Sequence, residues 1–207
     1  MYWVEFTTIA IAHLFAVASP GPDFAVVTRQ CITSGTRAGI WTSAGIGCGI
    51  LLHVSYCLLG VALLLSNSPP LFDAVKVIAA CYMIFLAVQS FRASLKMSAR
   101  TIEAEQVLNV QPYKAFLLGF FTNGLNPKAT LFFLALFTVV IDANTPLLVQ
   151  LIYGLYLALA TFVWFALLSK VLGRQSLREY LLRAGPWFER GMALILVLLA
   201  AQLFLTR

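Results

Sequence analysis

Two ionisable residues stand beside prolines in the middle of long apolar stretches. The first, Asp23, ends the motif Ser19-Pro20-Gly21-Pro22-Asp23, and the second, Lys128, follows Asn126-Pro127. Proline removes a helical hydrogen bond, so each motif interrupts a helix. At membrane depth such an interruption is tolerated only where protein or a water-filled cavity surrounds it. Matching interruptions in two halves of a chain point to the substrate site of a transporter.

The opposite charges of Asp23 and Lys128 suit a zwitterion, because a carboxylate can meet an ammonium group and a lysine can meet a carboxylate. Proline is favoured at the first helical position, after a capping residue such as Asn126 or a glycine such as Gly21. Each break therefore predicts a half-helix whose free N–H groups attract anions. Two alternatives stay open. Asp23 and Lys128 could form an ion pair that closes the bundle, or Asp23 could complement its own helix dipole.

Polar residues near the breaks add candidates. Gly45, Gly49 and His53 recur every four residues, and the small-residue spacing predicts a close helix contact, so His53 should point to protein. It could relay protons or make a satisfied interhelical hydrogen bond, and the same options apply to His13. The predicted substrate-binding or proton-coupling residues are Asp23, Lys128, His53, Asn126 and Asn123, and the helix-break residues are Pro20, Gly21, Pro22 and Pro127.

The composition is that of a membrane protein. Of 207 residues, 61% are hydrophobic and 11% are charged, with a mean hydropathy of +0.90, against roughly 45–50% and about 25% in soluble domains. A crossing needs about 20 apolar residues. The sequence predicts an all-α integral membrane protein with six transmembrane helices, the first and fourth broken, over Phe6–Cys31, Gly39–Leu65, Leu71–Phe91, Ala115–Ile141, Leu147–Ser169 and Gly191–Phe204.

The basic residues predict the orientation, because Lys and Arg are enriched in cytoplasmic loops. Lys76 and Arg207 lie on one side and Lys128 lies within a span. The other basic residues follow the first, third or fifth span: Arg29, Arg37, Arg92, Lys96, Arg100, Lys114, Lys170, Arg174, Arg178, Arg183 and Arg190. We therefore expect a multi-pass protein of the bacterial inner membrane with both termini in the periplasm.

The two breaks also predict a repeat. Pro127 follows Pro22 by 105 positions (127 − 22), and the same offset brings the second span close to the fifth. Three crossings per half would invert the second copy, as in many secondary transporters. The chain is predicted to be one transmembrane domain, 1–207, with repeat half 1 at 1–91, a cytoplasmic loop at 92–114 and half 2 at 115–207.

Several function classes fit poorly. The net charge of +6 arises from basic residues in short loops, which argues against nucleic-acid binding. Four scattered cysteines without a CxxC pair give no metal site, and no cofactor is expected. Ala16-Val17-Ala18 resembles a signal-peptide cleavage site, but the preceding residues lack Lys and Arg, so we expect a retained helix.

The motifs resemble those of the LysE/RhtB family of bacterial amino-acid exporters. The similarity runs through Pro20-Gly21-Pro22-Asp23, then through Ser34-Gly35-Thr36-Arg37-Ala38-Gly39 and the glycine-rich second span, and resumes at 119–129 with Asn123 and Asn126-Pro127-Lys128. The chain departs from the family pattern at 137–140, where a Pro-x-Phe element is common. The resemblance implies export of amino acids or their derivatives from the cytoplasm, against proton entry.

The sequence thus predicts a secondary transporter, not an enzyme, that exports an amino acid or derivative by proton antiport and alternating access. Its expected partners are a small zwitterionic substrate, protons and the lipid bilayer, with a homo-oligomer as a further possibility. The alternatives are an exporter of inorganic cations and a membrane-embedded enzyme. No HExxH or GxSxG motif supports the enzyme.

Overall fold

A computed structural model describes residues 2–67, 69–96, 110–142, 144–172, 186–187, 190–198 and 200–201. Across these residues every regular element is a helix. The elements are α1 (Tyr2–Ala18), α2 (Pro22–Asn67), α3 (Pro69–Lys96), α4 (Pro112–Gly124), α5 (Pro127–Ala135), the π-helix η1 (Leu136–Val140) and α6 (Leu147–Leu172). Residues 190–198 are also helical. Most of the predicted loop 92–114, the residues Arg174, Arg178 and Arg183, and the end of the predicted sixth span lie outside the described residues.

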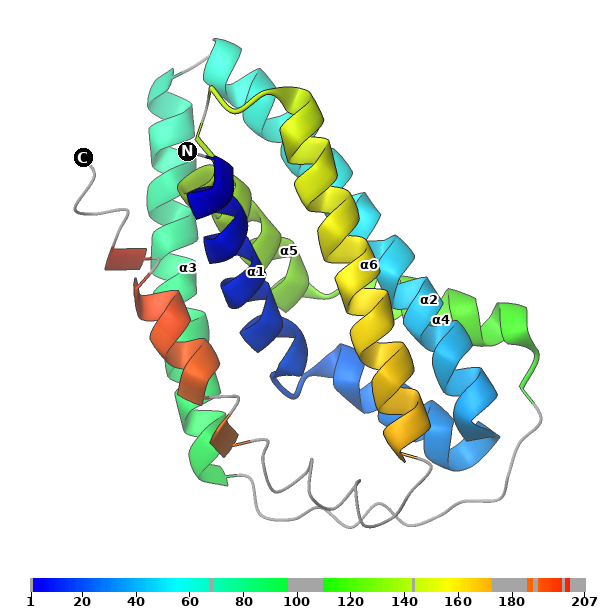
Figure 1. The fold of residues 1–207 in the computed structure, drawn as a ribbon. Coiled ribbons are helices and arrows are strands. Elements are labelled where there is room, and N and C mark those ends of the chain that lie inside the picture. Colours follow the sequence, from blue (N-terminus) through cyan, green and yellow to red (C-terminus); the bar gives the residue numbers. More distant parts are fainter. Residues whose placement is uncertain are drawn as a thin grey trace.

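Both predicted interruptions are present. The helix α1 ends at Ala18 and α2 begins at Pro22, while α4 ends at Gly124 and α5 begins at Pro127. The side chain of Asn126 caps α5 by accepting a 3.0 Å hydrogen bond from the Lys128 backbone N–H, as the sequence suggests. In Figure 1 both interruptions lie within the height of the bundle, between the levels at which α6 begins and ends.

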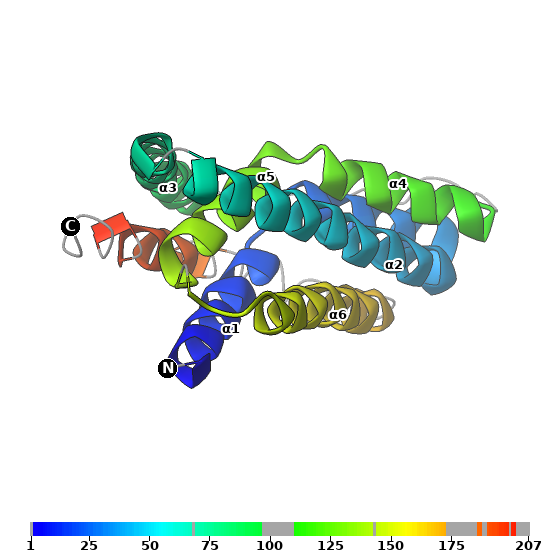
Figure 2. The same ribbon diagram turned by 90° about the horizontal axis from the view of Figure 1, so that it is seen from above.

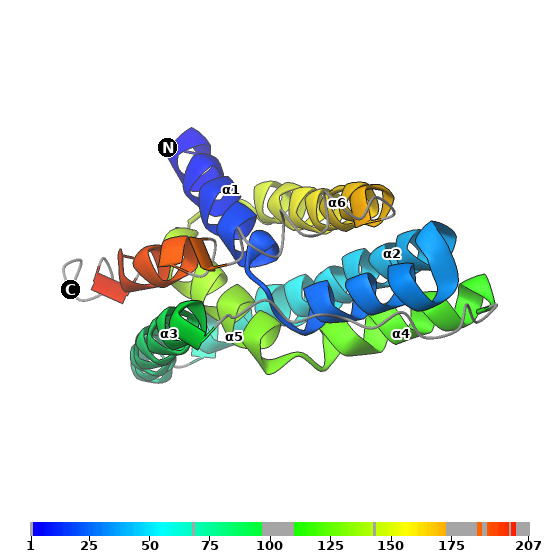
Figure 3. The ribbon, with the colours of Figure 1, turned by 90° about the horizontal axis from the view of Figure 1, so that it is seen from below.

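The predicted loop between the first two spans is instead a kink within α2. Only Gly35 leaves the helical conformation, with φ 82° and ψ 169°. Glycine reaches this region because it has no Cβ, so one residue redirects the chain and its neighbours stay helical. Thr33 supports the turn before the kink by donating from its hydroxyl to the Arg29 carbonyl at 3.0 Å. The change of direction is visible in Figure 3.

The outer surface of the bundle is apolar. Two helical stretches, Pro22–Gly60 and Leu147–Leu172, are long and apolar enough to cross a membrane, and shorter apolar helices cover Tyr2–Ala18, Ala80–Arg92 and Lys128–Val140. Large apolar side chains point outward on several helices, among them Trp3, Leu59, Leu125, Leu148 and Leu155. So much exposed apolar surface fits a lipid environment and not water. The chain is an all-helical membrane protein.

The helix α2 lies between α4 and α6 in the view of Figure 2, and it packs mainly against these two helices. Its contact with α4 brings the two backbones together. A Cβ atom at Gly45 would overlap the Phe116 carbonyl oxygen, and one at Gly119 would overlap the Thr42 carbonyl oxygen. The predicted close contact on the Gly45 face is therefore confirmed, and it is made with α4.

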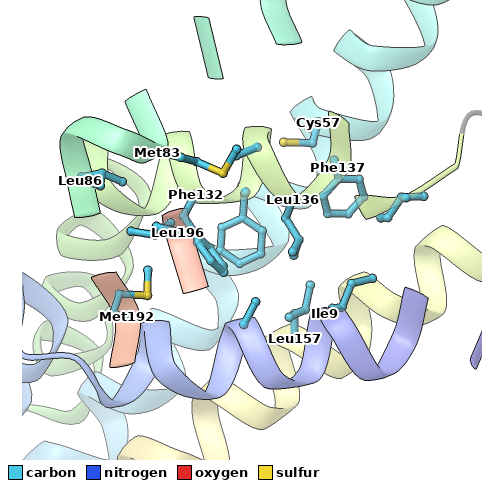
Figure 4. Close-up of a cluster of buried hydrophobic side chains, with 14 of the residues drawn as sticks. Ile9, Cys57, Met83, Leu86, Phe132, Leu136, Phe137, Leu157, Met192 and Leu196 are labelled. Carbon is cyan, nitrogen blue, oxygen red and sulfur yellow. The ribbon is translucent and has the colours of Figure 1, made fainter. Parts of the chain in front are cut away.

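A hydrophobic core joins α1, α3, α5, η1, α6 and the helical segment 190–198. Figure 4 shows Ile9, Leu136, Leu157, Met192 and Leu196 among its labelled side chains, and all five are almost fully buried. The core extends to the π-helix, where the hydroxyl of Thr138 donates to the Leu134 carbonyl at 2.8 Å. This packing fixes α1, which precedes the first interruption, and α5, which follows the second.

Candidate functional site

A cavity of about 60 Å³ lies where the two interruptions meet. Its polar lining comes from both breaks and from neighbouring positions on α1 and α6: His13, Ser19, Asp23, Asn123, Asn126, Lys128 and Thr161. Its apolar lining includes Val17, Phe24, Ile50, Phe132, Phe133, Phe165 and Met192. The cavity therefore combines a few convergent polar groups with aromatic and aliphatic walls, as small-molecule sites do.

Asp23 lies in the first turn of α2, directly after the first break. Its Oδ2 accepts a 2.8 Å hydrogen bond from Nδ2 of Asn123, in the last turn of α4. Its other oxygen, Oδ1, is buried and has no hydrogen-bond partner among the described residues. A buried carboxylate oxygen without a donor is costly, so this atom is an unsatisfied acceptor on a residue that lines the cavity.

Lys128 lies in the first turn of α5 and reaches back to the first break. Its Nζ donates to the Ser19 hydroxyl at 2.8 Å. The ammonium is also close enough to Asp23 to interact with its carboxylate electrostatically. Lys128 and Asn123 thus connect the second interruption to the first, and the opposite charges of Asp23 and Lys128 face one cavity.

His53 lies next to the cavity and does not line it. The ring is fully buried on α2, where its Nε2 lies 3.0 Å from the Asn123 carbonyl oxygen. Its Nδ1 contacts the Tyr56 hydroxyl, and the ring stacks on Phe133 with centroids 5.5 Å apart. The expectation that His53 points to protein is confirmed.

The cavity is also lined by Ser19 and Thr161, which sequence reasoning did not select, and by His13, a candidate with the same options as His53. Nε2 of His13 lies 2.8 Å from the hydroxyl of Thr161 on α6, and both line the cavity. Ser19 could have been found, because it opens the first motif. Thr161 gives no signal in the sequence, since it is one hydroxyl in an apolar helix. Among the predicted residues, Gly21 and Pro22 also line the cavity.

A second buried carboxylate, Glu5, lies near the start of α1. Thr145 donates from its hydroxyl to Glu5 Oε1 at 2.9 Å and lies 3.1 Å from Oε2. The Asp142 backbone N–H donates to Oε1 at 3.3 Å, and the Tyr153 hydroxyl lies 3.2 Å from Oε2. These contacts tie α1 to α6 and to the loop before it, and Glu5 does not line the cavity.

Comparison with known proteins decides the family. The family model described as "LysE type translocator" matches residues 14–207. The chain belongs to this family. The match includes both interruptions and every residue that lines the polar side of the cavity except His13. A translocator family makes the protein a transporter and not an enzyme.

Two relatives of this LysE type translocator are named as efflux proteins for amino acids. The threonine efflux protein of Escherichia coli (strain K12) is 27% identical over 186 residues, which are 89% of each chain. The leucine efflux protein of Salmonella choleraesuis (strain SC-B67) is 31% identical over 147 residues, which are 70% of this chain and 65% of the relative. No solved structure matches the chain significantly.

Proposed function

We propose that the protein exports a small amino acid or amino-acid derivative from the cytoplasm. The observation that carries this proposal is the pair of opposite charges, Asp23 and Lys128, which come from two separate helix interruptions and line one cavity. The names of the threonine and leucine efflux relatives support the same substrate class.

In this proposal the two ends of a zwitterion bind at different breaks. The ammonium group of the substrate donates to Asp23 Oδ1, the buried oxygen that lacks a donor among the described residues. The carboxylate binds near Lys128 and the start of α5, where the positive charge and the first backbone N–H groups favour an anion. Phe132, Phe165 and Met192 line the remaining wall, so an uncharged side chain is preferred.

Coupling to protons follows from the same carboxylate. When the substrate leaves toward the periplasm, the ammonium group leaves Asp23, and a proton from the periplasm takes its place. The empty site, with Asp23 protonated, then returns to the inward-facing state, and the proton is released to the cytoplasm. Export is thus an exchange of substrate for proton by alternating access.

The helix bounds support an inverted repeat of three spans plus three. With the 105-residue offset (127 − 22), the start of α2 at Pro22 corresponds to the start of α5 at Pro127. We propose six spans in the inner membrane, with both termini in the periplasm because the basic loops lie on the other side.

An export screen tests the proposal. Purified protein is reconstituted into proteoliposomes, and the vesicles are loaded with one labelled amino acid at a time. Efflux of that amino acid is followed with and without an imposed proton gradient. We expect gradient-driven efflux of one or a few uncharged amino acids, and loss of the gradient effect with an uncoupler. Divalent cations are included in the screen, and transport of a cation without any amino acid would contradict the proposal.

A further inference from the structure

A continuous line of contacts leads from His53 to the carboxylate in the cavity. His53 Nε2 contacts the Asn123 carbonyl at 3.0 Å, and the Asn123 amide donates to Asp23 at 2.8 Å. On the far side of the ring, Nδ1 contacts Tyr56. His53 does not line the cavity, so any influence it has on the substrate passes through Asn123.

The partners of His53 define which nitrogen carries hydrogen. A backbone carbonyl only accepts hydrogen bonds, so Nε2 must donate to Asn123. The Tyr56 hydroxyl can then donate to Nδ1, and the neutral ring satisfies both partners. Neither partner is negatively charged, and the charged groups Asp23 and Lys128 lie beyond Asn123. A second ring proton would place a cation in a fully buried position without a direct counter-charge, which is costly.

The Asn123 carbonyl lies at the end of α4, where His53 adds a second hydrogen bond. The last carbonyls of a helix lack intrahelical partners, and water cannot supply them in the membrane interior. The Asn123 carbonyl accepts from the Asn126 backbone N–H at 2.9 Å as well as from His53. His53 therefore holds the end of α4 at the break.

On its other face the Asn123 side chain lies against Gly49 of α2. A Cβ atom built at Gly49 would lie 2.7 Å from Asn123 Oδ1, so only glycine leaves room for the amide. With Oδ1 against α2 and the carbonyl held by His53, Nδ2 faces Asp23. One carboxylate oxygen is thereby fixed, and the other stays without a donor among the described residues.

We propose that His53 is a positioning residue that acts through Asn123 to orient Asp23 toward the substrate's ammonium group, and that it does not carry the coupled proton. The inference rests on the proposed function, since the ammonium group is part of that proposal. It assigns proton exchange to Asp23 and a fixed hydrogen-bond donor to His53. An amide that donates at the same place should therefore replace the imidazole.

Transport by matched variants tests the assignment. His53→Gln keeps a donor and cannot titrate, whereas His53→Leu removes the donor at similar size. We expect His53→Gln to keep gradient-driven export and the pH profile of the parent protein. We expect His53→Leu to raise the apparent KM about tenfold, the effect of losing a hydrogen bond near a charged group, with a smaller change in maximal rate. Substrate exchange without a gradient response in His53→Gln would overturn the assignment.

A spectroscopic measurement on the parent protein is independent of transport and of whether His53→Leu folds. The chain has only two histidines, so ¹⁵N-imidazole NMR of a protein without a histidine tag resolves both, and His53→Gln assigns the signals. We expect a neutral Nε2–H ring between pH 6 and 8, the range in which a free imidazole changes charge. A ring that protonates in this range would overturn the positioning role alone. A neutral ring together with no amino-acid transport would overturn the proposed function alone.

Discussion

Glu5 and Asp23, two acidic residues in the described part of the chain, differ in how far their carboxylate oxygens are satisfied. Both oxygens of Glu5 lie within hydrogen-bond distance of donors from the loop before α6 and from α6 itself. Asp23 has one oxygen bound to Asn123 and one without a partner among the described residues. Glu5 is buried and Asp23 is half-buried, so the more buried acid is the one whose two oxygens both have donors.

The difference indicates two roles for the same chemical group. A carboxylate whose two oxygens both have donors from the protein holds helices together, because another ligand would compete with existing hydrogen bonds. A carboxylate with an unused buried oxygen at a cavity is ready for a ligand. Glu5 joins α1 to α6, whereas Asp23 faces the space where the two breaks meet.

The largest expected effect separates the two acids by transport. In the proposed function the charge of Asp23 holds the ammonium group and accepts the proton, so we expect Asp23→Asn to lower gradient-driven export at least about a hundredfold, as loss of a charge pair implies. Residual substrate exchange is compatible with this role. Glu5→Gln is the matched control, and we expect it to retain export. Equal losses in both variants would remove the distinction.

Substitution of Lys128 tests the proposed binding of the substrate's carboxylate. Lys128→Ala should weaken export of an amino acid about tenfold or more and spare an analogue that lacks the carboxylate, which competition assays in proteoliposomes can measure. The rival explanation is an ion pair between Asp23 and Lys128 that only closes the bundle. In that case the double variant Asp23→Asn with Lys128→Met would recover both thermal stability and export.

Glu5 should matter more for stability than for transport. Glu5→Gln replaces a charged acceptor by an amide, and one of its atoms can no longer accept from Thr145, Asp142 or Tyr153. We expect a loss of about 1–3 kcal/mol in the free energy of unfolding, measured by thermal or denaturant unfolding in detergent. Tyr153→Phe removes one donor and should cost less. An unchanged unfolding transition in Glu5→Gln would contradict the structural role.

The smallest effect is expected at the wall of the cavity. Thr161→Val keeps the shape of the side chain and removes the hydroxyl that contacts His13. Because neither group is charged in this pair, we expect at most about a fivefold change in apparent KM, the effect of one neutral hydrogen bond, and little change in stability. Serine at this position should restore the parent behaviour. A loss as large as that of Asp23→Asn would place Thr161 at the centre of the mechanism.

The sequence predicts the interruptions well because Pro and Gly act locally. Asp23, Asn123, Asn126 and Lys128 could be selected from two motifs, although the motifs lie about a hundred residues apart. The partner Thr161, on α6, could not be selected in this way. A helix that is apolar on all sides has no polar face from which its rotation can be read, so contacts between such helices depend on packing that no local pattern shows.

Two further features depend on contacts that the sequence does not show. The kink at Gly35 occupies one residue, whereas the polar residues around it predict a full loop. The sequence does not show that a hydroxyl such as that of Thr33 bonds to a carbonyl of its own helix. The sequence predicts His53 among the residues that bind substrate or protons, and the structure places its ring behind Asn123, outside the cavity lining. Sequence spacing gives the face of α2 on which His53 lies but not its distance from the cavity.

The contact between α2 and α4 also limits how the protein can move. At Gly45 and Gly119 each backbone fills the space that a side chain would need on the other helix. Close-packed interiors resist small displacements, so these two helices form one mechanical unit, a fixed post within the bundle. Any motion that opens the cavity first to one side and then to the other must pivot around this post. In the alternating access proposed above, the moving parts are α1 and α5, because α6 packs on α2 nearly as extensively as α4 does.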